Sequence, residues 1–346
     1  MRSKHGGTFL GCLLVCGLLA GALVAPAAAA TYPKMLIKLA HSGVANQVHT
    51  LSFDRFAELV KQRSGGSIVV QVFPGNQLGT DRDAQEQVRN GTIQICNTNL
   101  VLLSDIPGWG PVGVLAMPYL VKGNSEEEVY RNFMKLTHDP LFTELNEKAG
   151  RESGIRVADF GWWFGERQLT TKTKPVTKPD DMKGLKLRTM DTPLVKAGLV
   201  ALGASATPMD ISEVYLALQM GIVDGQENPV SNIYVRKFYE VQKYLTLTGH
   251  MADLTLPIIN EKFYRGLQPE VRELLDKAFA DAGAYNNELS LKANSKGVQD
   301  LKDKGMTVVT VNRAEFAERT KDAWKQFEPK FGAGFYEKAK AIANKM

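Results

Sequence analysis

Residues 34–97 alternate between strand-like and helix-like patterns, and this alternation limits the folds that the chain can adopt. β-branched and apolar runs predict three strands, and helical periodicity predicts two helices between them. The expected strands are Lys34–Ala40, Ser67–Phe73 and Thr92–Asn97, and the expected helices are Leu51–Arg63 and Arg82–Arg89, the second capped by Asp81. A β-α-β-α-β order predicts a largely parallel sheet with right-handed crossovers.

Short polar side chains follow the first and third of these strands, in the loops 41–43 and 97–99. Ligands of such sheets bind beyond the carboxyl ends of the strands. Ser42 and Asn99 are therefore candidates for hydrogen bonding to a small ligand, and the alternative is that they cap their loops. His41 and His49 lie nearby in sequence, but no cysteine or carboxylate completes a ligand set at zinc spacing. We expect neither a metal nor a cofactor.

The N-terminus has the pattern of an export signal. An apolar run, Phe9 to Val24, follows Arg2 and Lys4 and precedes Ala25 to Ala30. The run is shorter than the roughly 20 residues that a membrane-spanning helix needs. A basic start, a short apolar region and an A-x-A end predict a secretory signal peptide over residues 1–30, cut after Ala30. An uncleaved anchor is the alternative. We expect the mature chain in the periplasm.

Cleavage there would change the charge and the cysteine count. Residues 1–30 contain two basic residues and no acidic one, so the formal net charge falls from +5 to +3 (5 − 2). So small an excess predicts no nucleic-acid partner. Cys96 is then the one cysteine left, and it cannot form an internal disulfide. The chain must rely on its core, and its length suits two domains of roughly 100–200 residues each.

Three aromatic residues stand between two glycines at 161–165, directly after the expected strand 155–160. One interpretation is a wall that stacks on a ligand, with Trp163 as the candidate. The other is that the rings fill a hinge or a domain boundary. We expect at least one of the three to line a cleft and the others to pack.

Arg188 ends a second kind of pattern, a short apolar strand over 184–188. A guanidinium at the exit of a strand presents a planar fork of donors that matches a carboxylate. The alternative is a surface salt bridge. Beyond it, residues 212–220 predict a helix, 222–225 a short strand, and 226–232 a polar loop broken by Pro229.

Several motifs in fixed order resemble the substrate-binding proteins of tripartite ATP-independent periplasmic (TRAP) transporters, in particular the DctP-like family. They are RQ at 167–168, DMKGLKLR at 181–188, ALGA at 201–204, SEVYLALQ at 212–219 and VDGQENP at 223–229. The resemblance covers the chain from about Leu36 onward. It implies a two-lobed α/β clamshell with mixed sheets, chain crossovers and long C-terminal helices.

The same resemblance implies where the two lobes lie in the sequence. The first lobe would take residues 31–160 and about 254–293. The second would take 161–253 and about 294–346, with crossing C-terminal helices. The lobes would close on a small organic acid without catalysis.

Residue roles carried over from the family are also expectations. Arg188 matches the family's carboxylate partner, Arg167 the arginine that assists it, and Asn228 the amide that contacts the carboxylate. His250 falls where some members place a polar group near the cleft.

Two positions depart from the members that bind sialic acid, which makes that ligand doubtful. Asp191 stands where those members have an amide, and Ile211 where they have an aromatic ring, with Asp210 beside it. If Asp191 or Asp210 faces the ligand, the ligand carries an ammonium or several hydroxyl groups beside its carboxylate. An aromatic acid is a further alternative, and Asp191 can equally be a helix cap.

Three classes of function follow. The first is a monomeric binding protein that delivers a small carboxylate to the membrane subunits of a TRAP permease. The second is a ligand-sensing protein on the same fold that feeds a receptor. The third is a secreted enzyme, but neither G-x-S-x-G nor H-E-x-x-H occurs in the sequence. We therefore expect no enzyme.

Overall fold

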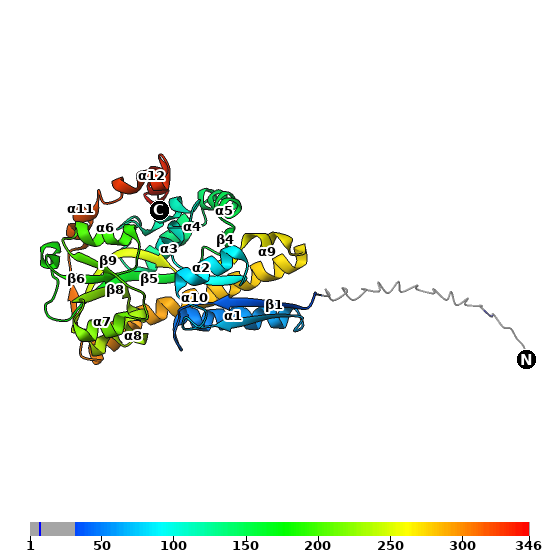
Figure 1. The fold of residues 1–346 in the computed structure, drawn as a ribbon, viewed down its shortest axis with the longest axis horizontal. Helices are drawn as coiled ribbons and strands as arrows, with labels where there is room; N and C mark the ends of the chain where they lie inside the picture. Colours follow the sequence, from blue (N-terminus) through cyan, green and yellow to red (C-terminus); the bar gives the residue numbers. More distant parts are fainter. Residues whose placement is uncertain (1–6, 8–31, 346) are drawn as a thin grey trace, which may run out of the picture. The chain divides into compact units, whose positions relative to one another are not determined.

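The computed structural model describes residue 7 and residues 32–345 (Figure 1). The predicted signal peptide, residues 1–30, therefore lies outside the described residues apart from Gly7. A compact unit begins at Tyr32. Within the described part of the chain, no helix combines the length and the apolar character needed to cross a bilayer.

Five strands form the first sheet, in the order β2-β1-β3-β10-β4. Their bounds are β1 Met35–Ala40, β2 Ile68–Phe73, β3 Ile95–Thr98, β4 Ile155–Val157 and β10 Leu256–Asn260. β1 is parallel to β2 and β3, with α1 (Val48–Arg63) and α2 (Asp81–Asn90) as the connections, as the alternation predicted. β10 inserts antiparallel between β3 and β4, so the sheet is mixed.

Six strands form the second sheet, in the order β11-β9-β5-β8-β6-β7. Their bounds are β5 Trp163–Thr171, β6 Lys186–Thr189, β7 Ser205–Pro208, β8 Gly225–Pro229, β9 Tyr244–Leu254 and β11 Thr307–Thr310. β9 belongs to the second sheet and β10 to the first, so the chain crosses between the sheets at Thr255. Two mixed sheets joined by crossovers confirm the predicted fold class.

The long helix α10 (Pro269–Asp303) connects the cores of both sheets (Figure 1). With 35 residues it is about 50 Å long, at ~1.5 Å per residue. Its first half packs with α1 and β1 through residues such as Phe279 and Leu275, and Leu301 near its end packs with α7 (Val214–Met220) and α8 (Val230–Val235). The long C-terminal helix was predicted from the sequence.

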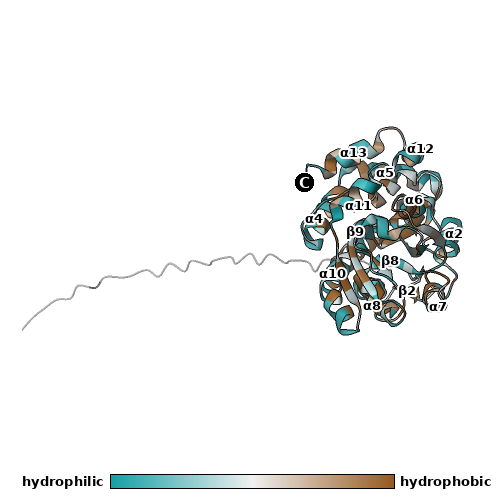
Figure 2. Cartoon of the chain, turned by 90° about the vertical axis from the view of Figure 1, so that its left-hand side faces the viewer, coloured by the Kyte–Doolittle hydropathy of each residue, from teal (hydrophilic) through white to brown (hydrophobic). Residues whose placement is uncertain are grey.

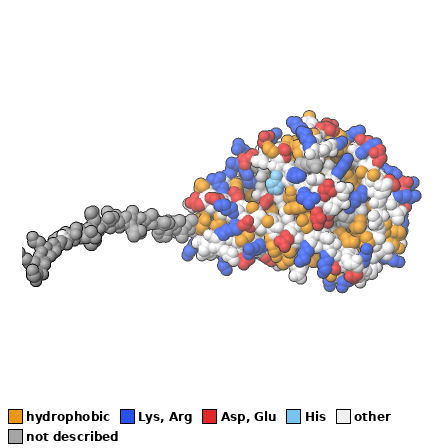
Figure 3. Space-filling model, turned by 180° about the vertical axis from the view of Figure 1, so that it is seen from behind, with side chains coloured by type: hydrophobic (Ala, Val, Ile, Leu, Met, Phe, Trp, Pro, Cys, Tyr) orange, Lys and Arg blue, Asp and Glu red, His pale blue; other side chains and the backbone are white. Residues whose placement is uncertain are grey.

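Shorter helices cover the remaining faces. They are α3 Leu100–Ser104, α4 Glu126–Thr137, α5 Pro140–Ser153, α6 Pro193–Ala201, α9 Glu261–Gly266, α11 Arg313–Thr320, α12 Glu328–Phe331 and α13 Phe335–Ala343, with 3-10 turns at Gly110–Ala116, Pro179–Met182, Phe238–Glu240 and Lys325–Phe327. Figure 2 shows hydrophobic and hydrophilic residues alternating along the outer helices, as expected of helices that bury one face. On the face in Figure 3, basic and acidic side chains are interspersed.

The segment after Asp224 differs from the sequence prediction. The sequence predicted that a short strand ends at residue 225 and that a loop follows. Residues 225–229 instead form β8 in the interior of the second sheet, paired with β5 and β6. All five residues are buried. A polar strand is stable there because its side chains bond to one another: for example, Gln226 Nε2 donates to Thr170 Oγ1 at 3.0 Å and Asn228 Nδ2 to Gln226 Oε1 at 2.6 Å.

The strands of the first sheet come from 31–160 and 254–293, and those of the second from 161–253 and 294–346, apart from Leu254 at the end of β9. The lobe boundaries themselves stay a prediction.

Candidate functional site

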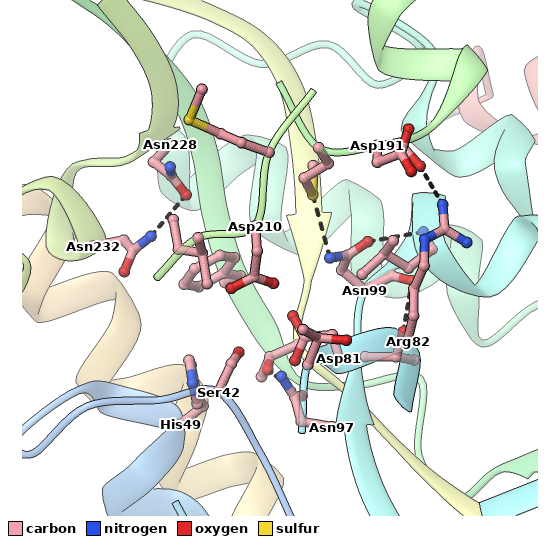
Figure 4. Close-up of a pocket in the computed structure, with 18 of the residues that line it drawn as sticks. Ser42, His49, Asp81, Arg82, Asn97, Asn99, Asp191, Asp210, Asn228 and Asn232 are labelled. Carbon is pink, nitrogen blue, oxygen red and sulfur yellow. Dashed lines mark hydrogen bonds between the residues drawn. The ribbon is translucent and has the colours of Figure 1, made fainter. Parts of the chain in front are cut away.

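A cavity of about 490 Å³ lies between the two sheets (Figure 4). The first sheet contributes the loop after β1, the start of α2 and the end of β3. The second sheet contributes β5, β6, β8, the turn after β7 and α8. The cavity therefore lies at the carboxyl ends of β1 and β3, where the sheet topology predicted a ligand.

Seven of the nine residues predicted for the site line this cavity. They are Ser42, Asn99, Arg167, Arg188, Asp191, Ile211 and Asn228. They come from six separate stretches of the chain, so the fold brings together side chains that the sequence keeps up to 186 positions apart, which is the separation of Ser42 and Asn228 (228 − 42).

The other two predicted residues, Trp163 and His250, do not line the cavity. Trp163 is the first residue of β5 and is fully buried, and its Nε1 donates to Glu126 Oε1 at 3.2 Å. Successive residues of a strand face opposite sides, so the neighbouring Phe164 lines the cavity in its place. His250 lies in a wide irregularity of β9 opposite Arg167–Leu169, where its Nε2 is 3.4 Å from Glu227 Oε2.

Arg188 is a buried cation that has no carboxylate beside it in the part of the chain that the structure describes. It is 2% exposed, and its Nε and Nη2 donate to the Met209 carbonyl at 3.1 and 2.9 Å. Among the described residues, no aspartate or glutamate lies within 4.0 Å of its guanidinium. Burial, with a smaller contribution from the charge of Arg167, lowers the pKa of Arg188 to about 10 against the opposing charge of Glu227. An anion in the cavity would supply the missing partner.

Arg167 is equally buried but fully paired. Nε and Nη2 contact Glu227, the latter at 2.9 Å from Oε1, and Nη1 lies 2.9 Å from Asp253 Oδ2. Burial alone would raise the pKa of Glu227, but Arg167 and His250 hold it at about 2. Burial raises the pKa of Asp253 to about 6, although Arg167 opposes the rise. Arg167 therefore orders the floor of the cavity and carries no spare charge for a ligand.

The Asn228 amide is held in one orientation by its neighbours. Its Oδ1 accepts from Arg167 Nη2 at 3.3 Å and from Asn232 Nδ2 at 2.7 Å, and its Nδ2 donates to Gln226 Oε1. Figure 4 shows Asn228 and Asn232 side by side at one end of the cavity. This leaves one amide hydrogen of Asn228 for an acceptor in the cavity.

Hydrogen bonds join elements of the two sheets around the cavity. Gln47 Nε2 donates to Asn232 Oδ1 at 2.9 Å, and Arg236 Nη2 donates to the Ser42 carbonyl at 3.1 Å. Asn76 Nδ2 lies 3.3 Å from Asp210 Oδ1, and Arg82 Nη2 donates to the backbone carbonyl of Asp191 (Figure 4).

Sequence reasoning missed Asp81, Arg236, Asn232, Gln47 and His49, all of which line the cavity. Asp81 was taken for the cap of α2, but the cap is Thr80, whose side chain accepts from the Asp83 N–H in a capping box. The spacing of Thr80 and Asp83 is that of a capping box, and it could have shown from the sequence that Asp81 is not the cap. No local pattern marks the other four residues, because they reach the cavity only through the tertiary fold.

Among the described residues, no group of three or more His, Cys, Asp or Glu side chains is arranged to hold a metal ion. Two mixed sheets that cross over and enclose a cavity, with a buried arginine that has no carboxylate partner within residues 32–345, are the features of a solute-binding protein.

Comparison with known proteins gives the family. The sequence model of the bacterial extracellular solute-binding proteins, family 7 (DctP), matches residues 39–330. The C4-dicarboxylate-binding periplasmic protein DctP of Rhodobacter capsulatus is 32% identical over 92% of this chain and 90% of its own length. The chain therefore belongs to the DctP family of TRAP transporter solute-binding proteins, which are not enzymes.

Solved structures agree with this assignment. A TRAP periplasmic solute-binding protein of Actinobacillus succinogenes with bound L-galactonate superposes with a TM-score of 0.83, at 30% identity over 90% of this chain and 100% of that one. A second, from Shewanella oneidensis with bound succinate, gives a TM-score of 0.81, at 27% identity over 90% of this chain and 100% of that one.

Proposed function

We propose that this protein captures a small organic carboxylate in the cavity between its two sheets and delivers it to the membrane subunits of a TRAP permease. The observation that carries the proposal is Arg188, a buried cation on the cavity wall with no carboxylate partner among the described residues. A buried charge needs a partner, and the planar guanidinium matches both oxygens of a carboxylate.

The neighbouring residues have complementary roles. The remaining amide hydrogen of Asn228 can reach the same carboxylate, and Arg167 holds Asn228 in place through its Oδ1. The ligands named for the similar proteins, C4-dicarboxylates, L-galactonate and succinate, all contain a carboxylate, which supports this role for Arg188.

The proposed location is the periplasm. The apolar N-terminal run and the alanines before Thr31 support export and cleavage after Ala30. N-terminal sequencing of the protein from a periplasmic extract should begin at Thr31. A mature chain that keeps residues 1–30 would contradict cleavage.

A thermal-shift screen against organic acids tests ligand capture. A ligand at 100 times its Kd should stabilise the protein by roughly 2.7 kcal/mol, which raises the melting temperature by several degrees. The matched variant Arg188→Met should lose the shift. If no carboxylate raises the melting temperature of the unmodified protein, ligand capture as proposed is wrong.

Uptake measurements test delivery. Membrane vesicles that contain the cognate permease should accumulate the captured acid only when the protein is added, and the protein is expected to act as a monomer. Uptake that is the same with and without it would leave the protein outside the transport step.

A further inference from the structure

Two aspartates from opposite sides of the cavity face each other, and each interacts electrostatically with Arg188. Asp81 is the first residue of α2, beside the first sheet, and Asp210 lies in the turn between β7 and α7 of the second. Figure 4 shows Asp210 pointing into the cavity toward Asp81 and Ser42. The two carboxylates are close enough that Asp210 raises the pKa of Asp81, although burial is the larger cause.

Both aspartates have oxygens that no protein group occupies within the described residues. Asp210 receives the Ser212 amide at 2.9 Å, the Ser212 hydroxyl at 2.6 Å and Asn76 Nδ2 at 3.3 Å, all at Oδ1. Its Oδ2 therefore remains for a ligand. The Ser42 hydroxyl lies close enough to Asp81 to lower the pKa of its carboxyl group, and the carboxylate has further acceptor positions open.

Hydrogen-bond donors from Arg236 and His49 line the same cavity as these carboxylate acceptors. Arg236 uses Nε on Asn232 Oδ1 at 3.1 Å and Nη2 on the Ser42 carbonyl, which leaves Nη1 for the cavity. His49 is 5% exposed, and neither of its ring nitrogens has a protein partner among the described residues. Burial holds the pKa of His49 well below its ordinary value, so the ring is neutral and offers one donor and one acceptor.

This mixed end of the cavity discriminates between ligand chemistries. A second carboxylate would face the negative oxygens of Asp81 and Asp210, and like charges that close repel. An ammonium would find those oxygens but would also lie in the field of Arg236, which acts on both aspartates. A hydroxyl group donates to a carboxylate and accepts from a guanidinium or imidazole, so it satisfies both kinds of neighbour without adding charge.

We propose that the ligand is a polyhydroxy monocarboxylate, such as an aldonate, whose carboxylate binds Arg188 and whose hydroxyl groups bind Asp81, Asp210, His49 and Arg236. This inference rests on the proposed function, because it places the carboxylate at Arg188. Asp81 and Asp210 then select against dicarboxylates.

Acids with carbon chains of equal length separate the alternatives. Isothermal titration would compare caproate, which has the carboxylate alone, with adipate, which adds a second one, and ε-aminocaproate, which adds an ammonium. A panel of aldonates that differ in configuration, gluconate and galactonate among them, adds hydroxyl groups. We expect at least one aldonate to bind at least about tenfold more tightly than caproate, because hydrogen bonds to charged groups are the strong ones. Adipate should bind no better than caproate.

The variant Asp210→Asn keeps the shape of the side chain and removes its charge. We expect it to weaken the best aldonate about tenfold, while caproate, which has no hydroxyl groups to lose, binds no more weakly than before and adipate binds more tightly. Retained caproate binding shows that the variant is folded and that Arg188 is still available. Asp180→Asn, on an exposed side chain whose partner is Arg319, is the matched control and should change none of the three.

The results of these titrations distinguish failure of the aldonate inference from failure of carboxylate capture. Binding of adipate or ε-aminocaproate in preference to every aldonate, or an Asp210→Asn variant with unaltered aldonate affinity, overturns this inference and leaves capture of a carboxylate standing. If no acid of the series binds, this inference is contradicted, and the wider thermal-shift screen of organic acids decides whether capture of a carboxylate stands.

Discussion

Arg167 and Arg188 line the same cavity, but Arg167 contacts two carboxylates and Arg188 contacts none among the described residues. Both side chains are 2% exposed. The pairing has opposite consequences: the carboxylates of Glu227 and Asp253 counter the burial of Arg167 and raise its pKa, whereas burial lowers the pKa of Arg188 to about 10. One arginine therefore holds the fold together, and the other is left for a ligand.

Arg188→Met should separate binding from stability. Methionine fills a similar volume and removes the charge, so we expect the affinity for the best carboxylate to fall by about 3 kcal/mol, or roughly a hundredfold. The ligand-free protein should lose no more than about 1 kcal/mol of its free energy of unfolding, because the lost bonds to the Met209 carbonyl are offset by removing a buried charge. Titration calorimetry and urea unfolding measure the two quantities. A large loss of stability without loss of affinity would reverse the roles.

Arg167→Met, unlike Arg188→Met, should greatly lower the free energy of unfolding. The change leaves Glu227 and Asp253 buried without their cation, and we expect a loss of about 3–5 kcal/mol. Replacing one acid as well, in Arg167→Met with Glu227→Gln, should recover part of that loss, because only Asp253 is then left without its cation. Urea unfolding of both single variants and of the double variant checks this. A double variant as unstable as the sum of the two single ones would show that the pairing of Arg167 with Glu227 contributes nothing.

Features encoded by neighbouring residues could be predicted from the sequence. The alternation of strands and helices predicted the parallel part of the first sheet. Ser42 and Asn99 directly follow the carboxyl ends of two of its strands, and both line the cavity. The motif around Arg188 placed it there as well. Each of these depends on a local pattern or on the edge of one sheet.

Features that depend on register or on contacts between distant segments could not be predicted. Trp163 and Phe164 exchange roles because the facing of a strand depends on its register, and a single step reverses it. Asp81 lies near Asp210 only because two separate sheets enclose one cavity. No spacing in the sequence predicts that the two residues are close together.

Gln47→Ala tests the contacts that join the two sheets around the cavity. Gln47 Nε2 donates to Asn232 Oδ1 across the cavity at 2.9 Å. Losing a bond of about 1 kcal/mol should weaken ligand binding about fivefold, mainly through a faster koff, because the bond joins the two sides of the cavity around the ligand. Stopped-flow displacement measures koff, and scattering measures the compaction on ligand binding.

The matched control for that prediction is Gln62→Ala. Gln62 is on the same helix but exposed, and its Nε2 bonds only to Glu58. It should leave koff unchanged. Equal effects of the two variants would indicate a general change in α1 and not a loss of the contact with Asn232.

Asp81→Asn should stabilise the ligand-free protein in a way that depends on pH. Burial, followed by the charge of Asp210, raises the pKa of Asp81 to about 6, against the opposing effects of Ser42, Arg236 and Arg188. Between the unfolded value of 3.8 and about 6, the folded protein binds more protons than the unfolded chain. The free energy of unfolding therefore falls as the pH rises through that window, and the full penalty is present above about pH 6.

Asparagine removes that penalty, so the variant should be more stable at neutral pH, and its advantage should disappear toward about pH 4, where Asp81 is protonated in the unmodified protein. We expect about 1 kcal/mol, because the carboxylate is only half-buried and the start of α2 favours its negative charge. Urea unfolding across this pH range measures it, with Glu86→Gln on the exposed face of the same helix as the control. An advantage that stays constant from neutral to acid pH would mean that Asp81 does not titrate in this window, because a group that is ionised or protonated throughout contributes the same free energy at every pH.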